Sequence, residues 1–320
     1  MNARTFSAAS LATALVMVLP AGAADSQLLN LVMPDAVVVA GANVAQAKTS
    51  PFGQYILQQI QSSSDPGLQK LIAATGFDPT QDVSETLAAS NGSKQTGVLL
   101  ARGTFDPSRI ATAATTDKAI VENYNGVSII EDPGKTFGLA FPSSSIAVAG
   151  DLADVKAALD RVSAPSSLPA SLMVQINQLS GTQDAWAIST VPLSTFHPNA
   201  QGPAKSAAAA VPGLNGQGVF QAIQSASGGV KFGANVVVSG QAQADNAQDA
   251  QSMSDALKLL ASLAQLQAGK EPALAAVAQS VQISSSGATL SVSLSIPEAT
   301  LEQLMVHPNN APAHRPVRKM

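Results

Sequence analysis

The chain has 320 residues, no cysteine and a formal net charge of -4, and only 12% of its residues are charged, about half the proportion usual in globular proteins. The lack of cysteine excludes disulfides, thiolate nucleophiles and cysteine-ligated metals, so a hydrophobic core must hold the fold together. The small net charge argues against binding to nucleic acid or to an acidic membrane surface.

The amino-terminal segment has the order of a secretory signal. Arg4 precedes an uncharged apolar run from Phe6 to Leu19, and Ala21-Gly22-Ala23 supplies small residues for cleavage. The alternative is an uncleaved membrane anchor, but the run is shorter than the roughly 20 residues that a spanning helix needs. We therefore expect residues 1–23 to be removed, leaving a periplasmic or secreted protein with no membrane span.

The first predicted module covers residues 24–163. Ala36–Ala40 and Gly97–Arg102 are short apolar runs that predict strands. Ser50-Pro51 combines an N-cap with a proline at the first helical position, and Asp151 is a second expected N-cap. Ser163–Pro169, rich in serine and proline, then marks the expected end of the module.

The second predicted module covers residues 164–306. Alternation in Val230–Ser239 predicts a hairpin that turns at Gly228-Gly229. Asp245 with Gln248 is a capping-box variant and predicts the start of a long helix. In Val281–Ile296, apolar and hydroxyl residues alternate on both sides of a Ser-Gly turn, which predicts a second hairpin.

Both modules mix strands with covering helices in a similar order, which we interpret as an internal repeat. The sequence thus predicts an α+β fold of two similar modules, each a mainly antiparallel sheet with helices packed on one face. Residues 307–320 combine proline with basic side chains and are expected to form a disordered basic tail.

Short motifs at expected caps and turns of the first module also carry a family resemblance. They are Met33-Pro34-Asp35-Ala36, Ser50-Pro51, Gly76-Phe77-Asp78 with Asp82, Gly103-Thr104-Phe105-Asp106, Tyr124-Asn125-Gly126 and Val148-Ala149-Gly150-Asp151. With these motifs the segment from Leu28 to Arg161 resembles uncharacterised exported bacterial proteins. The resemblance implies an exported α+β protein without an assigned activity, and it supplies no catalytic residue.

Histidine chemistry has few candidates. His197-Pro198-Asn199 and His307-Pro308-Asn309 repeat a tripeptide, and the two imidazoles would form part of a metal site if their loops met. No carboxylate or third histidine stands at ligand spacing, so we predict no metal site. A serine hydrolase would need His197, His307 or His314 as its base, and no serine lies in a nucleophile motif.

Carboxylate pairs and glycines are explained without catalysis. Asp78 with Asp82, and Asp151 with Asp154, stand at helix or loop starts, where capping and the helix dipole favour a negative charge. The glycines of 213–218 superficially resemble a dinucleotide loop, but they follow an alanine run and not a buried strand. We therefore predict no catalytic and no cofactor-binding residue.

Two features suggest binding. The hydroxyl row Thr289, Ser291, Ser293 and Ser295 offers an uncharged surface to a glycan or a partner strand, or is simply the wet side of a sheet. The apolar stripe of the 245–267 helix lines a hydrophobic ligand cavity, or only covers the sheet. The sequence favours a non-enzymatic binding or scaffold protein of the cell envelope, whose partner is an envelope protein, a glycan or a hydrophobic ligand. The alternative is a carrier of a hydrophobic small molecule held between sheet and long helix, and an enzyme of unknown type comes third.

Overall fold

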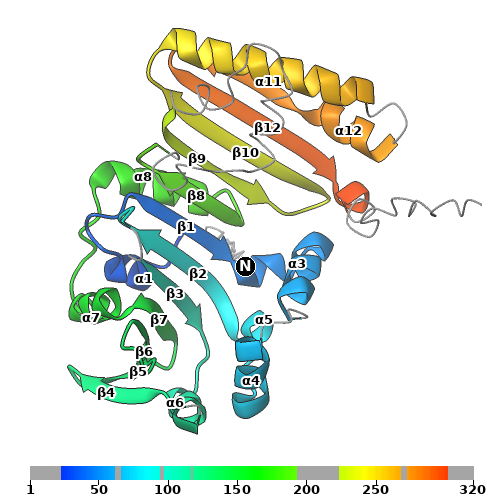
Figure 1. The fold of residues 1–320 in the computed structure, drawn as a ribbon. Coiled ribbons are helices and arrows are strands. Elements are labelled where there is room, and N and C mark those ends of the chain that lie inside the picture. The colour runs from blue at the N-terminus through cyan, green and yellow to red at the C-terminus, as the bar shows by residue number, and fades with distance from the viewer. Residues whose placement is uncertain are drawn as a thin grey trace, which may run out of the picture.

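The computed structural model describes residues 23–61, 66–93, 97–116, 118–192, 223–267 and 272–301. Its strands form one 12-stranded sheet in the order β11-β12-β10-β9-β8-β1-β2-β3-β7-β6-β5-β4 (Figure 1). The strands are β1 (Val38–Asn43), β2 (Val83–Ser90), β3 (Val98–Gly103), β4 (Ile120–Tyr124), β5 (Val127–Glu131), β6 (Phe137–Ser143), β7 (Ile146–Asp151), β8 (Ala185–Ser189), β9 (Ile223–Lys231), β10 (Asn235–Ala244), β11 (Gln282–Ser286) and β12 (Thr289–Pro297).

Every neighbouring pair in the sheet is antiparallel, which together with the helices confirms the predicted α+β class. The helices are α1 (Ser26–Leu31), α2 (Val44–Ala47), α3 (Pro51–Gln61), α4 (Pro66–Thr75), α5 (Pro79–Asp82), α6 (Pro107–Thr116), α7 (Leu152–Asp160), α8 (Ala170–Ser180), α11 (Ala247–Gln267) and α12 (Pro272–Ser280). None of these described helices is long and apolar enough to cross a membrane.

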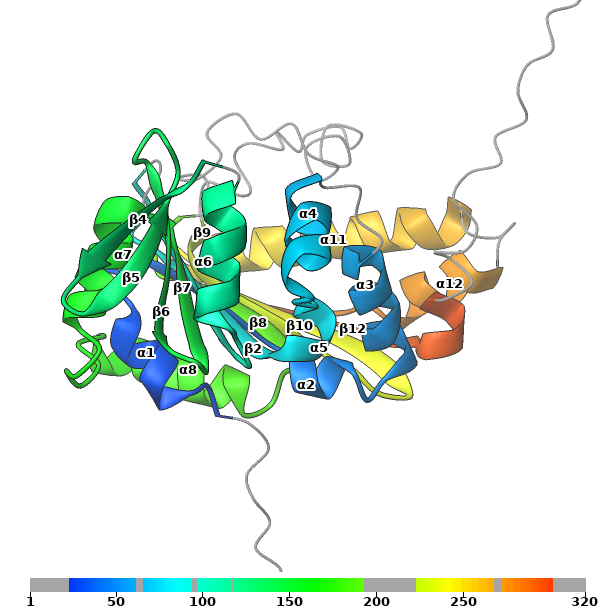
Figure 2. The same ribbon diagram turned by 90° about the horizontal axis from the view of Figure 1, so that it is seen from below.

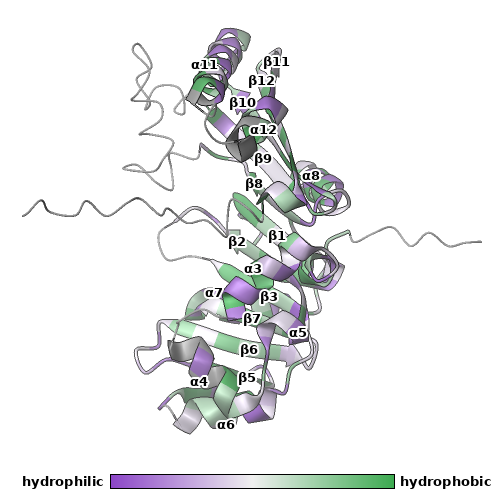
Figure 3. Ribbon diagram, turned by 90° about the vertical axis from the view of Figure 1, so that its right-hand side faces the viewer, coloured by the Kyte–Doolittle hydropathy of each residue, from purple (hydrophilic) through white to green (hydrophobic). Residues whose placement is uncertain are grey.

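Helices cover both faces of the sheet. Successive strand residues point to opposite faces, and apolar residues on both faces need a covering layer. Ile129 packs in a core with α1, α7 and α8, whereas its neighbour Ile130 packs in a second core with α6. The register of the strands across the sheet puts Leu290 on the same face as Ile130, and Leu290 packs under α11. We call these the α8 face and the α11 face, and Figures 2 and 3 show α8 and α11 on opposite sides of the sheet. Both halves thus have helices on two faces of the sheet, whereas the sequence predicts helices on one face of each module.

Several local predictions are confirmed. β11 and β12 form the predicted carboxy-terminal hairpin, with Ser286 opposite Thr289 across the turn. Asp151 caps α7 by accepting a hydrogen bond from the backbone nitrogen of Ala153 at 3.0 Å. α3 begins at Pro51, one residue after the buried Ser50, whose hydroxyl accepts from the nitrogen of Gly53.

The predicted turn at Gly228-Gly229 is wrong. Both glycines lie inside β9, which runs on to Lys231 before the chain turns into β10. A Cβ at Gly228 would lie 2.5 Å from the carbonyl oxygen of Ser239, and one at Gly229 would lie 2.6 Å from that of Ala185. Close strand approach, and not a turn, therefore explains these two glycines.

The predicted cap of the long helix is also wrong by one residue. The side-chain oxygen of Asn246 accepts from the nitrogen of Asp249 at 3.0 Å, which is the N-cap bond of α11. Asp245 instead accepts from the side chain of Gln224 in β9. Aspartate and asparagine cap equally well, so the sequence does not decide between adjacent candidates.

The sheet and its main core continue across the predicted boundary at residue 163. β1 pairs with β8, so that Gly41 lies opposite Trp186. The largest core cluster unites Val39 and Leu87 of the first half with Leu172, Ile176 and Trp186. The module limits 24–163 and 164–306 stay a prediction, but the strands on either side of residue 163 share one core.

Candidate functional site

An open apolar hollow lies on the α11 face, over the middle of the sheet, with a volume of about 790 Å³. We call it the trough. Two rows of paired residues cross its floor. One row holds Val238, Val230 and Ala185, and the other holds Ala226, Ser189 and Val38. Its lining is Val38, Ser90, Ala185 to Ser189, Ala226 to Val230, Val238 and Ser239. The lining contains no charged residue.

The helices stand to either side of the trough. α11 packs on β10, β11 and β12 at one end of the sheet, and α4 and α6 lie toward the other end (Figures 1 and 3). Between these helices the sheet carries the small side chains of Ala185, Ala187 and Ala226, which leave the hollow open. Ala187 is exposed and Val238 keeps 39% of its surface exposed, so apolar sheet surface meets solvent here.

The hydroxyl row lies on the opposite face and lines a second hollow of about 440 Å³ beside α8. Ser291 and Ser293 contribute to it, together with Ser239 and Gln241 of β10 and three glutamines of α8 and the loop after it: Gln175, Gln178 and Gln183. Thr289, at the end of the row, donates its hydroxyl to Gln243 at 3.0 Å. All four residues of the row are half-buried, and its middle part, Ser291 and Ser293, lines an uncharged groove and not a flat surface.

Of the two alternatives for the long helix, a ligand cavity or a cover for the sheet, the packing beneath α11 fits the cover. Met253 and Ala250 are buried against Leu290, and Leu257 packs at the edge of the same cluster. Phe232 instead makes an edge contact with Phe52, with ring centroids 5.6 Å apart. None of the hollows described here is lined by α11. The apolar hollow lies beside this helix and not beneath it.

The aspartates considered as acid pairs have structural partners. Asp78 accepts from the nitrogen of Thr80 at the start of α5, and Asp82 accepts from the nitrogen of Asp78. Asp154 accepts from the nitrogen of Gly97, the residue before β3, at 2.8 Å. The Asp78 and Asp82 contacts support the predicted capping, whereas the Asp154 contact with Gly97 is not foreseeable from sequence.

Other sequence candidates lie outside the described residues. These are the signal segment before residue 23, His197, His307, His314, the glycines of 213–218 and the tail 307–320. Within the described ranges, no group of three or more histidine and carboxylate side chains is placed to hold a metal ion.

A carboxylate pair beside α7 was missed by sequence reasoning. Glu131 is fully buried, and the Lys135 and Lys156 amines lie 3.7 and 3.8 Å from its oxygens. Lys156 also contacts Glu122 of edge strand β4 at 3.0 Å. The neighbouring Glu122 carboxyl, and then burial, raise the pKa of Glu131. Strand pairing brings these groups together, and only the spacing of Glu131 and Lys135 is local in sequence.

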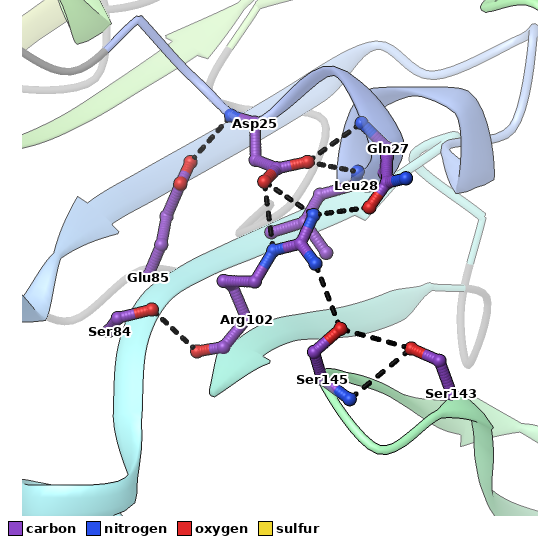
Figure 4. Close-up of polar contacts among 8 residues, drawn as sticks. All are labelled: Asp25, Gln27, Leu28, Ser84, Glu85, Arg102, Ser143 and Ser145. Atoms are coloured by element: carbon purple, nitrogen blue, oxygen red, sulfur yellow. Dashed lines mark hydrogen bonds and ion pairs between the residues drawn. The ribbon is translucent and has the colours of Figure 1, made fainter. Parts of the chain in front are cut away.

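A second polar network fixes the start of the described chain (Figure 4). The guanidinium of Arg102 donates to the Asp25 carboxylate at 2.8 and 2.5 Å and to the Gln27 side chain at 2.6 Å. The other oxygen of Asp25 caps α1 by accepting from the nitrogens of Gln27 and Leu28. The nitrogen of Asp25 donates to Glu85 at 3.0 Å. This cluster anchors the segment before α1 to strands β2 and β3.

The sequence matches no protein-family model and no curated protein. Among solved structures, crystal form III of TP0453 is similar, with a TM-score of 0.56, 12% identity, and coverage of 88% of this chain and 98% of that chain. Crystal form I of TP0453 gives a TM-score of 0.53 at 12% identity, over 88% of this chain and 96% of that chain. At this identity the likeness concerns the fold alone. The resemblance to uncharacterised exported bacterial proteins stays a prediction.

Proposed function

We propose that this protein is a non-enzymatic binding protein of the cell envelope and that the trough is its site. The observation that carries the proposal is the uncharged, open trough over β1, β8, β9 and β10. Its volume lies in the range of small-molecule sites, roughly 300 to 1,000 Å³. Apolar surface left in water is unfavourable in proportion to its area, so covering the trough with an apolar group supplies binding energy.

Within this function, the trough favours the carrier of a hydrophobic small molecule over a scaffold. The floor is built from alanine, valine and glycine, and four serines belong to the lining. Ser90 and Ser189 lie in the same row as Val38, whereas Ser227 and Ser239 follow Ala226 and Val238 and therefore point to the opposite face of the sheet. Such a lining has few groups to orient a polar ligand and no charge to pair with an ionic one. We therefore propose a neutral, mainly hydrocarbon ligand.

The arrangement of charges supports binding over catalysis. Lys231 is paired with the buried Asp184 at 2.6 Å, and Arg102 is paired with Asp25. Neither pair faces the trough lining. A nucleophile and its base within hydrogen-bond reach, which covalent catalysis requires, are not among the residues that line the trough.

A neutral fluorescent probe, N-phenyl-1-naphthylamine, tests the proposal directly. We expect saturable fluorescence enhancement with the mature protein, and an affinity at least about tenfold lower for Ala187→Asp, because a charge in an apolar site costs more than about 1.4 kcal/mol. Val174→Asp is the matched control, since Val174 on α8 is 65% exposed and lies away from the trough. Equal probe affinity of Ala187→Asp and the unchanged protein would rule out the trough as the site.

Native mass spectrometry of protein purified from its own host separates the carrier from the scaffold. A retained small molecule, lost in the Ala187→Asp variant, supports the carrier. A stoichiometric partner protein without a small molecule, also lost in that variant, supports the scaffold.

A further inference from the structure

The backbone passes from solvent into the core between Ala23 and Ala24. Ala23 is exposed, whereas Ala24 is 8% exposed and belongs to the main core cluster. The nitrogen of Ala24 donates to the hydroxyl of Ser180 at 3.0 Å in a buried hydrogen bond. The bond between these two alanines is also the expected cleavage site of the secretory signal. Hydrolysis there leaves a carboxylate on Ala23 and an ammonium group on Ala24.

The surroundings of the Ala24 nitrogen favour a positive charge. Ser180 is the last residue of α8, and a helix carries partial negative charge at its carboxyl end. One residue further along the chain, the nitrogen of Asp25 donates to a Glu85 carboxylate oxygen at 3.0 Å. Because consecutive backbone nitrogens lie at most about 3.7 Å apart, the Ala24 nitrogen is within about 7 Å of this carboxylate.

Arg102 is the cation that acts on Glu85, and it forms its own ion pair with Asp25. Burial raises the pKa of Glu85 above the ordinary value of 4.5, although the Asp25 backbone hydrogen bond and the Arg102 charge both lower it. Arg102, the cation of this cluster, is bound to Asp25, Gln27 and Ser145 (Figure 4). Among the described residues, the ion pairs do not include Glu85.

We propose that the α-ammonium group of Ala24, created by cleavage after Ala23, docks between the carboxyl end of α8 and Glu85 as a permanent part of the fold. The inference rests on the expected cleavage after Ala23 and is independent of the trough. An unprocessed chain has a neutral amide at this position, so Glu85 and the negative end of the α8 dipole then lack this positive charge. Signal removal thereby stabilises the fold as well as releasing the protein.

The test compares the chain that begins at Ala24 with one that begins at Ala23, which differs by a single residue. We expect the thermal midpoint of the Ala24 chain to be about 2–4 °C higher, the shift that a modest electrostatic gain produces in a domain of this size class. The same comparison in the Glu85→Gln background is the control, and there the difference should shrink to less than half. Equal midpoints of the two unchanged chains would overturn the proposal.

A chemical readout separates docking of the amine from a general effect of chain length. An amine-acylating reagent at neutral pH should modify the α-amine of the native Ala24 chain at least about tenfold more slowly than in urea, since a buried and paired ammonium resists both contact and deprotonation. Equal rates in both conditions contradict docking. A host-purified protein whose first residue is not Ala24 contradicts it as well.

Discussion

Trp186 fixes the middle of the sheet, where β8 pairs with β1 on one side and β9 on the other. It lies opposite Gly41 on β1 and Gly229 on β9, and only 6% of it is exposed. The bulky indole therefore has a glycine on both neighbouring strands. A Cβ at Gly41 would lie 2.6 Å from the Cζ2 atom of the ring. Gly41 leaves room for the ring, and this explains its place inside a strand, whereas Gly229 is required by the close approach of the Ala185 carbonyl oxygen.

Gly41→Ala should therefore destabilise the protein by about 1–3 kcal/mol, the usual cost of overpacking a core. Gly240→Ala is the matched control, because a Cβ there meets nothing closer than the carbonyl oxygen of Ser227 at 3.7 Å. That change should be neutral or stabilise by up to about 1 kcal/mol. Urea unfolding followed by Trp186 fluorescence measures both, and a neutral Gly41→Ala would show that the ring can move.

The buried Glu131 should make stability depend on pH. Its pKa is raised by the neighbouring Glu122 carboxyl and by burial, so the folded state holds the proton more tightly than the unfolded state. Its stabilising contribution is thus present below the ordinary value of 4.5 and is lost as the pH rises through the higher folded pKa. Glu131→Gln, which is neutral at every pH, should raise the urea midpoint at pH 7 and change it less at pH 4.

Glu122→Gln provides the contrast, because the same contact and the Lys156 amine lower the pKa of Glu122. Its contribution is present above the ordinary pKa of 4.5 and is lost as the pH falls through the lower folded value. Glu122→Gln should therefore lower the midpoint at pH 7. If both variants moved it in the same direction, the assignment of the buried proton to Glu131 would fail.

At the scale of single elements, the start of α11 gives a sharp test of capping. Asn246→Ala removes the side chain that accepts from the nitrogen of Asp249 and should cost about 1 kcal/mol. Asp245→Ala removes only a contact with the exposed side chain of Gln224 and should cost less than about 0.5 kcal/mol. Denaturant midpoints of the two single variants compare them, and the reverse order would restore Asp245 as the cap.

Elements were predictable where one local rule decides them. The β11–β12 hairpin follows from strict alternation, and Asp151 caps α7 because an aspartate precedes an apolar helical stripe. The Gly228-Gly229 pair has no such single rule, because a glycine pair serves both a turn and a close strand contact. The close contact depends on the carbonyl oxygens of Ser239 and Ala185, which only the register of the strands brings near. The trough escaped prediction for the same reason, since β1 and β8 meet only through long-range pairing.

At the scale of the whole molecule, the β1–β8 pair joins the two halves into one sheet. Strand pairing alone would not make the folding of one half depend on the other. The shared main core makes it depend, because Leu172, Ile176 and Trp186 are buried together with Val39 and Leu87 of the first half. Removing α8 and β8 therefore uncovers the α8 face of the first half as well as the edge of β1.

We expect a fragment of residues 24–163 to lack a cooperative thermal transition, whereas residues 24–192 should unfold cooperatively. The shorter fragment loses the side chains of Leu168, Leu172, Ile176, Trp186 and Ile188, each less than 9% exposed in the full chain. Burial of each such side chain contributes about 1.5–3 kcal/mol, so the loss of all five is comparable to the whole stability of a typical domain, about 5–15 kcal/mol. Far-UV circular dichroism with heating compares the fragments. A cooperative transition in residues 24–163 alone would instead make the first predicted module an independent folding unit, and the shared core a docking interface between two finished domains.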